Sequence, residues 1–324
     1  MYASLRRMAV VSADTEIRLV ALEGGVSSAI YRVDAAGGTF CVKRALPKLK
    51  VAGDWRAPVE RNRSEVDWLR YVSSLCPGHV PAILGDDAEG GAFAMTWLPP
   101  TDFPTWKALL RDGRIDAADA GAVGDLLGRI HAATADNADI ARAFAHDAIF
   151  HSIRLEPYLV ATGRAHPDLA AHFAALVVTT QSQRRVLVHG DYSPKNILIG
   201  ADGPVILDAE CACFGDPAFD VAFVLNHLLL KGVWRPQWRA LYMDALDALV
   251  EGYRRHAGWE SWAALDARVA ALLPALMLAR VDGKSPAEYL DSAADQDAVR
   301  AFARPRVAEA PQRIGDIVRD WRRG

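Results

Sequence analysis

Asp191, Asn196 and Asp208 carry ligand oxygens and surround a short predicted β-hairpin. The apolar run 197–199 begins just after Asn196, a glycine-containing turn follows, and the return run 205–207 ends just before Asp208. The two strands of a hairpin lie side by side, so Asn196 and Asp208 meet at one end of it, and Asp191 lies on the loop that leads into it. Two carboxylates and an amide oxygen around one small volume favour Mg²⁺, which binds oxygen ligands in octahedral geometry.

The sequence before this hairpin predicts an antiparallel sheet. Pro99 and Pro100 end its last strand, and we place a boundary there between two domains, 1–98 and 99–324. The predicted strands are separated by turn residues and cover residues 17–22, 29–33, 39–44, 82–85 and 92–98.

The loop 23–28 joins the first two predicted strands and contains Gly24, Gly25, Ser27 and Ser28. Small residues leave backbone N–H groups open to an anion such as a phosphate. An ordinary β-turn explains the same residues equally well, so this loop by itself does not establish a phosphate site.

Lys43 lies in an otherwise apolar strand, on the same predicted face as Cys41. The segment 60–75 has the apolar spacing of a helix, and Glu65 lies on the apolar side of that helix. A carboxylate that faces inward needs a cation. Lys43 is the cation that this layout offers to Glu65, and Glu60 is the alternative acid.

The second domain is predicted to be mainly helical. Its helices are recognised from the 3.6-residue spacing of apolar positions, which is clearest in the segment 117–133. The other predicted helices cover residues 104–110, 138–147, 151–162, 167–181, 218–231, 237–255, 259–280 and 316–322.

These motifs together resemble a known family. The stretch His189-Gly-Asp-Tyr-Ser-Pro-Lys-Asn196, followed by Ile206-Leu-Asp208 and Gly215-Asp-Pro-Ala-Phe-Asp220, is similar to the aminoglycoside phosphotransferase and choline kinase superfamily. The resemblance covers residues 15–225 and implies an α+β, protein-kinase-like bilobal fold. Its N-lobe is an antiparallel sheet with one helix, and its C-lobe is larger and mostly helical. The loop 23–28 departs from the kinase pattern G-x-G-x-x-G.

The resemblance implies a role for each matching residue. Asp191 would be the catalytic residue that orients the acceptor hydroxyl and takes its proton late, because a carboxyl with a pKa of about 4 is a weak base for an alcohol. Asn196 and Asp208 would hold Mg²⁺ between the phosphates of ATP. Lys43, oriented by Glu65, would bind the α- and β-phosphates. The further nucleotide contacts would be Gly25, Ser27 and Ser28 to the phosphates, and Met95, Trp97 and Leu98 to the adenine.

The residues that contact the acceptor are less evident from the sequence. Lys195 would neutralise the transferred phosphoryl group or contact an anionic substrate, or it would simply face solvent. Asp216 fits either a substrate role or a structural one. Arg280, Asp282 and Lys284 follow an apolar helix and are candidates to face the substrate. The alternative is that they are polar residues at a helix C-terminus, where cations are favourable.

The overall composition excludes several classes of protein. With a net charge of −3 over 324 residues, the chain does not predict nucleic-acid binding. The four cysteines lack paired C-x-x-C spacing, so we expect reduced thiols and no zinc site. No apolar run reaches the roughly 20 residues of a membrane helix. We therefore expect a cytoplasmic protein without a membrane or nucleic-acid partner, as a monomer or homodimer.

The sequence thus predicts a kinase that uses ATP and Mg²⁺ to phosphorylate a hydroxyl of a small molecule. Eleven residues separate Asp208 from Asp220 and no Ala-Pro-Glu follows, which leaves little room for the peptide-docking segment of a protein kinase. A catalytically silent nucleotide-binding scaffold is the alternative from a different class. The sequence does not choose among aminoglycoside-, choline-, sugar- and amino-acid-like acceptors.

Overall fold

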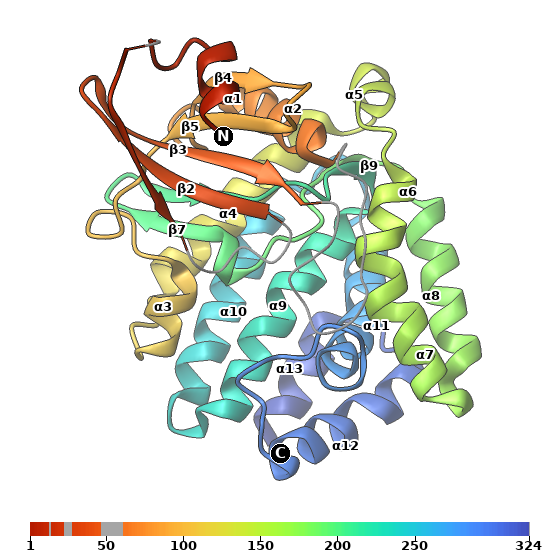
Figure 1. The fold of residues 1–324 in the computed structure, drawn as a ribbon. Coiled ribbons are helices and arrows are strands. Elements are labelled where there is room, and N and C mark those ends of the chain that lie inside the picture. Colours follow the sequence, from red (N-terminus) through yellow and green to blue (C-terminus); the bar gives the residue numbers. More distant parts are fainter. Residues whose placement is uncertain (13, 23–27, 47–60, 324) are drawn as a thin grey trace.

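The structure is a computed structural model, and it describes residues 1–12, 14–22, 28–46 and 61–323 (Figure 1). Its N-terminal part is one antiparallel five-stranded sheet with the strand order β1-β2-β3-β5-β4. All five strands predicted from the sequence are present in it. They are β1 (Ile17–Ala21), β2 (Ser28–Ala35), β3 (Gly38–Ala45), β4 (Ile83–Asp87) and β5 (Ala92–Thr96).

The two faces of this sheet are covered by different helices. Helix α1 (Tyr2–Arg7), which the sequence analysis did not predict, packs over the face that carries Phe40 and Val42. Helix α2 (Arg61–Leu75) packs against the other face through its apolar side. Since β3 alternates its side chains, Lys43 points toward α2 from the middle of the sheet.

The rest of the chain forms a larger lobe that is almost entirely helical (Figure 1). The first of its helices are α3 (Trp106–Arg111), α4 (Ala117–Thr134), α5 (Ala138–Ala143), α6 (Asp147–Phe150), the π-helix η1 (His151–Val160), α7 (Ala161–Ala165), η2 (Pro167–Leu169) and α8 (Ala170–Ser182). The later ones are α9 (Pro217–Trp234), η4 (Pro236–Trp238), α10 (Arg239–Arg254), α11 (Trp262–Asp282), α12 (Ala293–Glu309) and α13 (Ile314–Arg323). This arrangement is the predicted α+β, kinase-like bilobal fold.

Three helices differ from their sequence predictions. The predicted helix 138–147 ends at Ala143, because Phe144 leaves the helical conformation. The predicted helix 151–162 is largely π-helical and contains Pro157, which cannot donate a backbone hydrogen bond. Helix α12, with Pro305 inside it, was not predicted.

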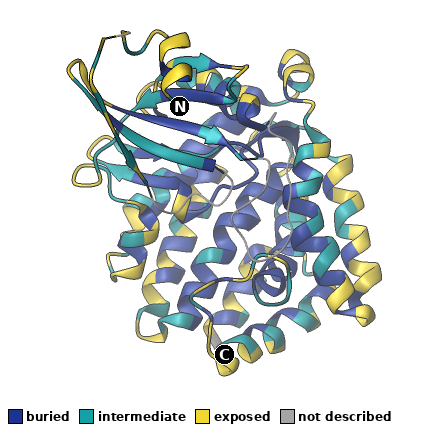
Figure 2. Ribbon diagram, in the orientation of Figure 1, coloured by how far each residue is buried: buried dark blue, intermediate teal, exposed yellow. Residues whose placement is uncertain are grey.

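The helices of the C-lobe surround α9, which is buried along most of its length (Figure 2). Helices α4 and α10 approach each other closely because small residues lie where they cross. A Cβ atom on Gly124 would lie 2.0 Å from the Leu249 carbonyl oxygen, and one on Gly252 would lie 2.3 Å from the Gly121 carbonyl oxygen. These glycines therefore set the distance between the two helices.

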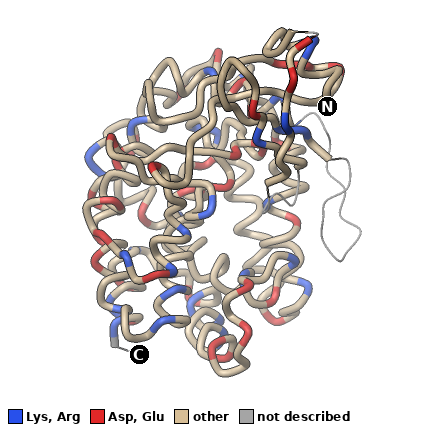
Figure 3. Tube along the Cα trace, turned by 60° about the vertical axis from the view of Figure 1, so that its left-hand side comes forward, with Lys and Arg blue, Asp and Glu red and all other residues tan. Residues whose placement is uncertain are grey.

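Helix α11 corresponds to the predicted helix 259–280 and has 21 residues. By length and composition alone it could cross a membrane, with a mean hydropathy of 1.5, but 61% of that stretch is buried inside the protein. It packs against α9 and α12, as a core helix does. Acidic and basic residues are interspersed over both lobes (Figure 3).

Candidate active site

The predicted hairpin around the oxygen ligands is present in the structure. Strands β7 (Ile197–Gly200) and β8 (Gly203–Ile206) pair antiparallel, with Ile197 opposite Ile206. The Leu207 N–H donates to the Asn196 carbonyl oxygen at 2.8 Å. The backbone thus brings Asn196 next to Asp208, at the end of the hairpin that faces the N-lobe.

The loop before the hairpin follows β6 (Val186–Val188) and is held by the first turn of α9. The carboxylate of Asp220 accepts the backbone N–H of His189 at 2.6 Å and that of Gly190 at 2.8 Å. Gly190 has a φ of +77°, and a Cβ atom there would lie 2.7 Å from the Cys211 carbonyl oxygen. Only glycine fits this position, which explains the residue between His189 and Asp191.

His189 supports the loop from within. Its Nε2 bonds to the Leu207 carbonyl oxygen at 3.0 Å, and its Nδ1 accepts the Asp191 backbone N–H at 3.1 Å. Burial lowers the pKa of this imidazole. A neutral ring with its proton on Nε2 satisfies both contacts, so His189 ties Asp191 to Leu207, which follows β8 and precedes Asp208.

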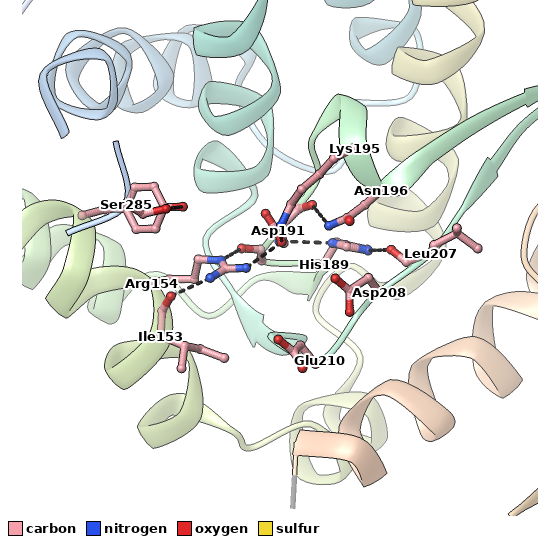
Figure 4. Close-up of polar contacts among 12 residues, drawn as sticks. Ile153, Arg154, His189, Asp191, Lys195, Asn196, Leu207, Asp208, Glu210 and Ser285 are labelled. Carbon is pink, nitrogen blue, oxygen red and sulfur yellow. Dashed lines mark hydrogen bonds and ion pairs between the residues drawn. The ribbon is translucent and has the colours of Figure 1, made fainter. Parts of the chain in front are cut away.

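Asp191 is buried between two cations (Figure 4). Its carboxylate is 2.8 Å from the guanidinium of Arg154 and 3.0 Å from the Nζ of Lys195. Burial alone would raise the pKa of Asp191, but Arg154 and Lys195 outweigh it and lower the pKa. Asp191 is therefore ionised at neutral pH and ready to accept a hydrogen bond from a hydroxyl.

Arg154 comes from the π-helix η1 and is nearly as buried as Asp191. It also donates to the carbonyl oxygens of Gly190 and Ile153. The sequence analysis missed this residue, because a single arginine in a predicted helix gives no signal that it faces a carboxylate far away in the chain.

Asn196 and Asp208 lie at the same end of the β7–β8 hairpin. The Asn196 Nδ2 donates to the Asp191 carbonyl oxygen at 3.0 Å, which leaves the amide oxygen of Asn196 available. Asp208 has a φ of +64°, a sparsely populated conformation for a non-glycine residue that is often found at functional sites. Hard oxygens of this kind fit Mg²⁺, which takes its remaining ligands from waters and phosphates.

The predicted metal ligands Asn196 and Asp208 are not part of a larger ligand cluster in the described part of the chain. Among the described residues, no group of three His, Cys, Asp or Glu side chains is arranged as metal ligands. Glu210, two residues after Asp208, lies on the same side of the loop (Figure 4), and it is bound by the Arg61 Nε at 3.0 Å. The Asp-Ala-Glu spacing was the sequence signal for Glu210, and the sequence analysis did not use it.

Lys43 connects the sheet to the C-lobe. Its Nζ is 2.6 Å from the Glu65 carboxylate and also contacts the Asp208 carboxylate. Burial would lower the pKa of Lys43, but the two carboxylates outweigh it and raise the pKa. The sequence prediction that Glu65 is the partner of Lys43 agrees with this contact. The alternative acid, Glu60, lies outside the described residues.

The other predicted nucleotide contacts lie in the N-lobe part of the sequence, and the structure describes some of them. Gly25 and Ser27 lie outside the described residues, and Ser28 is the buried first residue of β2. Met95, near the end of β5, and the following Trp97 and Leu98 are half-buried. Their contact with the adenine stays a prediction.

Two of the predicted substrate residues, Asp216 and Asp282, have cationic partners within the chain. Asp216 caps α9 and is bound by Arg268 at 3.1 Å, and Asp282 is bound by Arg300 at 2.7 Å. These contacts explain Asp216 and Asp282 without a substrate, so a substrate role for them stays a prediction.

The other two predicted substrate residues, Lys284 and Arg280, differ in burial. Lys284 is exposed and pairs with a surface glutamate. Arg280 is buried, and its guanidinium lies 5.9 Å from the centre of the Tyr158 ring, which is also 5.9 Å from the guanidinium of Arg154. Arg280 is therefore the member of the predicted set that the structure brings toward Asp191.

The sequence of the chain matches a known family over most of its length. Residues 18–268 match the family model described as the phosphotransferase enzyme family, APH. The chain belongs to this family. Its helical and sheet elements are consistent with that membership, which also agrees with the resemblance to aminoglycoside phosphotransferases and choline kinases.

Similar curated proteins include methylthioribose kinases. The chain is 27% identical over 230 residues to the enzyme of Erwinia tasmaniensis, which covers 62% of this chain and 57% of that protein. It is 22% identical over 233 residues to methylthioribose kinase 2 of Oryza sativa subsp. japonica, with 62% and 53% covered. The chain therefore spans little more than half the length of these relatives.

Solved structures share the fold at low sequence identity. A choline/ethanolamine kinase family protein from Mesorhizobium loti has a TM-score of 0.53 at 16% identity, with 100% of this chain and 99% of that chain covered. An amicoumacin kinase in complex with AMP-PNP, Ca²⁺ and Ami has a TM-score of 0.54 at 15% identity, with 97% and 95% covered. An ethanolamine kinase from Plasmodium vivax has a TM-score of 0.57 at 11% identity, with 93% and 86% covered.

Proposed function

We propose that this protein transfers the γ-phosphate of ATP, in the presence of Mg²⁺, to a hydroxyl group of a small molecule. The observation that carries this proposal is the ionised Asp191 carboxylate, held 2.8 Å from Arg154 beside the oxygens of Asn196 and Asp208. The family and the names of the related kinases support the same reaction class. In this proposal residues 1–98 bind the nucleotide, and residues 99–324 carry the catalytic loop, the metal ligands and the acceptor site.

The chain's own residues have distinct tasks in this reaction. Asp191 accepts a hydrogen bond from the acceptor hydroxyl and orients its oxygen toward the γ-phosphorus. As the new oxygen–phosphorus bond forms, the bond from the γ-phosphorus to the bridging oxygen of ADP breaks, and the hydroxyl proton passes to Asp191. Lys195, which is 54% exposed, lies where it can offset negative charge on the transferred group.

Asn196 and Asp208 would hold Mg²⁺, which when bound neutralises charge on the ATP phosphates. Lys43 is available to the α- and β-phosphates once its contact with Asp208 is replaced by the metal ion. Glu65 keeps Lys43 in place throughout, because both side chains are buried and paired. Each part of the site therefore has a specific partner in the nucleotide or the acceptor.

The test is Mg²⁺-dependent ADP release over a panel of hydroxyl compounds, with the Asp191→Asn variant as comparison. Turnover of a small hydroxyl compound by the wild type, lost in the variant, is the expected result. Binding of ATP–Mg²⁺ without turnover of any compound would favour a silent scaffold, and turnover of a peptide library would favour a protein kinase. Absence of ATP–Mg²⁺ binding would contradict the proposed function altogether.

A cytoplasmic monomer or homodimer is our proposal, and sedimentation of the purified full chain distinguishes these two assemblies.

A further inference from the structure

Five lysine and arginine side chains are buried in the described part of the chain, and they differ in their partners. Lys43, Arg61 and Arg154 each have a carboxylate oxygen within 3.0 Å. Lys231 and Arg280 form no ion pair with a described residue. Burying a cation without a counter-ion is costly, so these two residues need an explanation.

Lys231 lies near the C-terminal end of α9 and is 2% exposed. Its Nζ is 4.6 Å from the centre of the Tyr289 ring and 5.5 Å from that of Trp234. Within the described chain it has no hydrogen-bond acceptor. Aromatic rings stabilise a cation only partly, so the ammonium group still lacks an anion.

Arg280 lies near the end of α11, with its guanidinium 5.9 Å from the centre of the Tyr158 ring and close enough to Tyr289 to act on it electrostatically. Its Nη1 donates to the Ser285 hydroxyl at 3.0 Å and to the Tyr158 hydroxyl at 3.4 Å, whereas its Nε has no acceptor in the described structure. The hydroxyl of Tyr289 is also buried without a partner there. We call Lys231, Arg280 and Tyr289 the cation site.

The surroundings of the cation site are mainly positive. Lys107, Arg111 and Arg235 act electrostatically on Lys231, and the carboxylate that acts on it is Glu288. Glu288 is 60% exposed and already pairs with Lys107, so it does not neutralise the site.

Titration of the buried groups supports this picture. Burial first, and then the nearby cation Lys107, lowers the pKa of Lys231 to about 8. Burial also holds the pKa of His227 well below its usual range, and Arg280 and Lys231 lower it further. An anion bound between these groups would relieve both effects.

The cation site is continuous with the catalytic loop. Phe223, His227 and Lys231 occupy one face of α9 at intervals of four residues. Arg154, which binds Asp191, lies 5.9 Å from the Phe223 ring, and that ring is 5.6 Å from the ring of His227. At 1.5 Å per helical residue, Lys231 lies about 12 Å along the helix from Phe223.

We propose that the acceptor is a hydroxyl compound that also carries a carboxylate or phosphate group, which binds to Lys231, Arg280 and the Tyr289 hydroxyl. Arginine suits the planar or tetrahedral oxygens of such a group. This inference rests on the proposed kinase function and specifies its substrate class.

The test compares acceptors that share one carbon skeleton and differ in charge. ADP release by the full chain with Mg²⁺ and ATP is measured for ribitol, ribonate, ribitol 5-phosphate and the corresponding amino-alcohol. The same neutral, acid, phosphate and amine series is measured on the glycerol skeleton. We expect kcat/KM at least 10-fold higher for the acid or the phosphate than for its neutral counterpart. The acid and phosphate arms show which anionic group is preferred.

Substitutions then test the cation site itself. Lys231→Met keeps a flexible chain of similar length and should raise the KM for the anionic acceptor at least 10-fold, whereas Lys231→Arg should restore much of the affinity. Arg254→Met is the matched control, because it also removes a cation near an indole ring (5.4 Å from Trp262) but on an exposed part of α10. We expect wild-type kinetics for this control, and thermal melting establishes that each variant is folded.

The outcomes separate the two proposals. Higher kcat/KM for the neutral or amino compounds, or equal KM values in the wild type and Lys231→Met, would overturn the anionic acceptor while the kinase function stands. Binding of the ATP–Mg²⁺ complex with neither turnover nor binding of any anionic compound would overturn it as well. Failure to bind ATP–Mg²⁺, measured by calorimetry, would instead contradict the proposed kinase function.

Discussion

The catalytic loop and the cation site are about equally buried, but their buried charges are balanced in different ways. Around Asp191 and Asp208 every buried charge has an opposite charge from the chain itself: Arg154 for Asp191, and Lys43 for Asp208. Around Lys231 and Arg280 the described chain provides aromatic rings and hydroxyls but no ion pair, since the nearby Glu288 is exposed and pairs with Lys107. The reaction centre is therefore preorganised before substrates arrive, whereas the acceptor region lacks an anion until one binds.

The physical reason for this difference is the cost of removing a charge from water. A buried ion pair recovers much of this cost through its partner, but a single buried cation does not. The C-lobe tolerates two such cations because the large apolar core around α9 and α11 supplies stability elsewhere. Binding of an anionic ligand would return part of that cost as affinity.

The largest difference between the two regions is expected when the Asp191 carboxylate is neutralised. Asp191→Asn keeps the shape of the side chain but removes the group that accepts the proton, so we expect kcat to fall by about 10²–10⁴-fold. The Kd for ATP–Mg²⁺ should change little. Single-turnover kinetics and calorimetry measure the two quantities, and Asp202→Asn, in the exposed turn between β7 and β8, is the control. An unchanged kcat would remove Asp191 from the mechanism.

Removal of the buried arginine tests whether the catalytic loop depends on its own ion pair. Arg154→Met removes the buried cation of Asp191 and leaves only the exposed Lys195 beside it, and we expect the free energy of unfolding to fall by about 3–5 kcal/mol. In Lys231→Met no carboxylate of the described chain loses a partner, so that variant should be as stable as the wild type or more stable. Denaturant unfolding of both variants measures the contrast, and equal losses would contradict the comparison.

The free energy of unfolding should depend on alkaline pH through Lys231 in the cation site. The pKa of Lys231 is about 8 in the folded protein, below its value of about 10.5 in an unfolded chain. Between these two pH values the unfolded state binds more protons, so stability rises with pH, by on the order of 2 kcal/mol. Denaturant unfolding at pH 8 and pH 10 measures this, and the rise should be absent in Lys231→Met. A similar rise in the variant would show that another group is responsible.

The smallest effect is expected from a surface ion pair next to the cation site. Lys284 is 51% exposed and lies 2.8 Å from the Glu156 carboxylate. Exposed pairs of this kind contribute about 0–1 kcal/mol, so Lys284→Met should change the melting temperature by only a few degrees. A loss as large as that of Arg154→Met would mean that this pair is a structural part of the C-lobe.

Much of the fold and of the reaction centre followed from local sequence patterns. The turn between β7 and β8 and the apolar runs on either side of it fixed the position of Asn196 next to Asp208, because a tight hairpin leaves few alternatives. The alternation along β3 placed Lys43 on the face opposite Phe40, toward the helix that carries Glu65. The strand and helix predictions of the N-lobe succeeded for the same reason, except that α1 lacked a sequence signal.

The C-lobe was less predictable because its important contacts join distant helices. The π-helical conformation of η1 aims Arg154 at Asp191, and apolar spacing does not predict that conformation. Asp216 and Asp282 were candidates for substrate contact, but whether Arg268 and Arg300 reach them depends on how α9, α11 and α12 pack. A residue's type therefore indicated a charge, and only packing showed whether that charge had a partner.

By itself the sequence determined a kinase-like chain with a His-Gly-Asp loop, two metal-ligand candidates and a lysine–glutamate pair, because these depend on short spacings and on strand alternation. The tertiary structure alone decided that Asp191 is balanced by Arg154, and that Lys231 and Arg280 are buried without an ion pair to a described residue. The energy of a charge depends on what surrounds it in space. That environment is formed by segments that are far apart in the sequence.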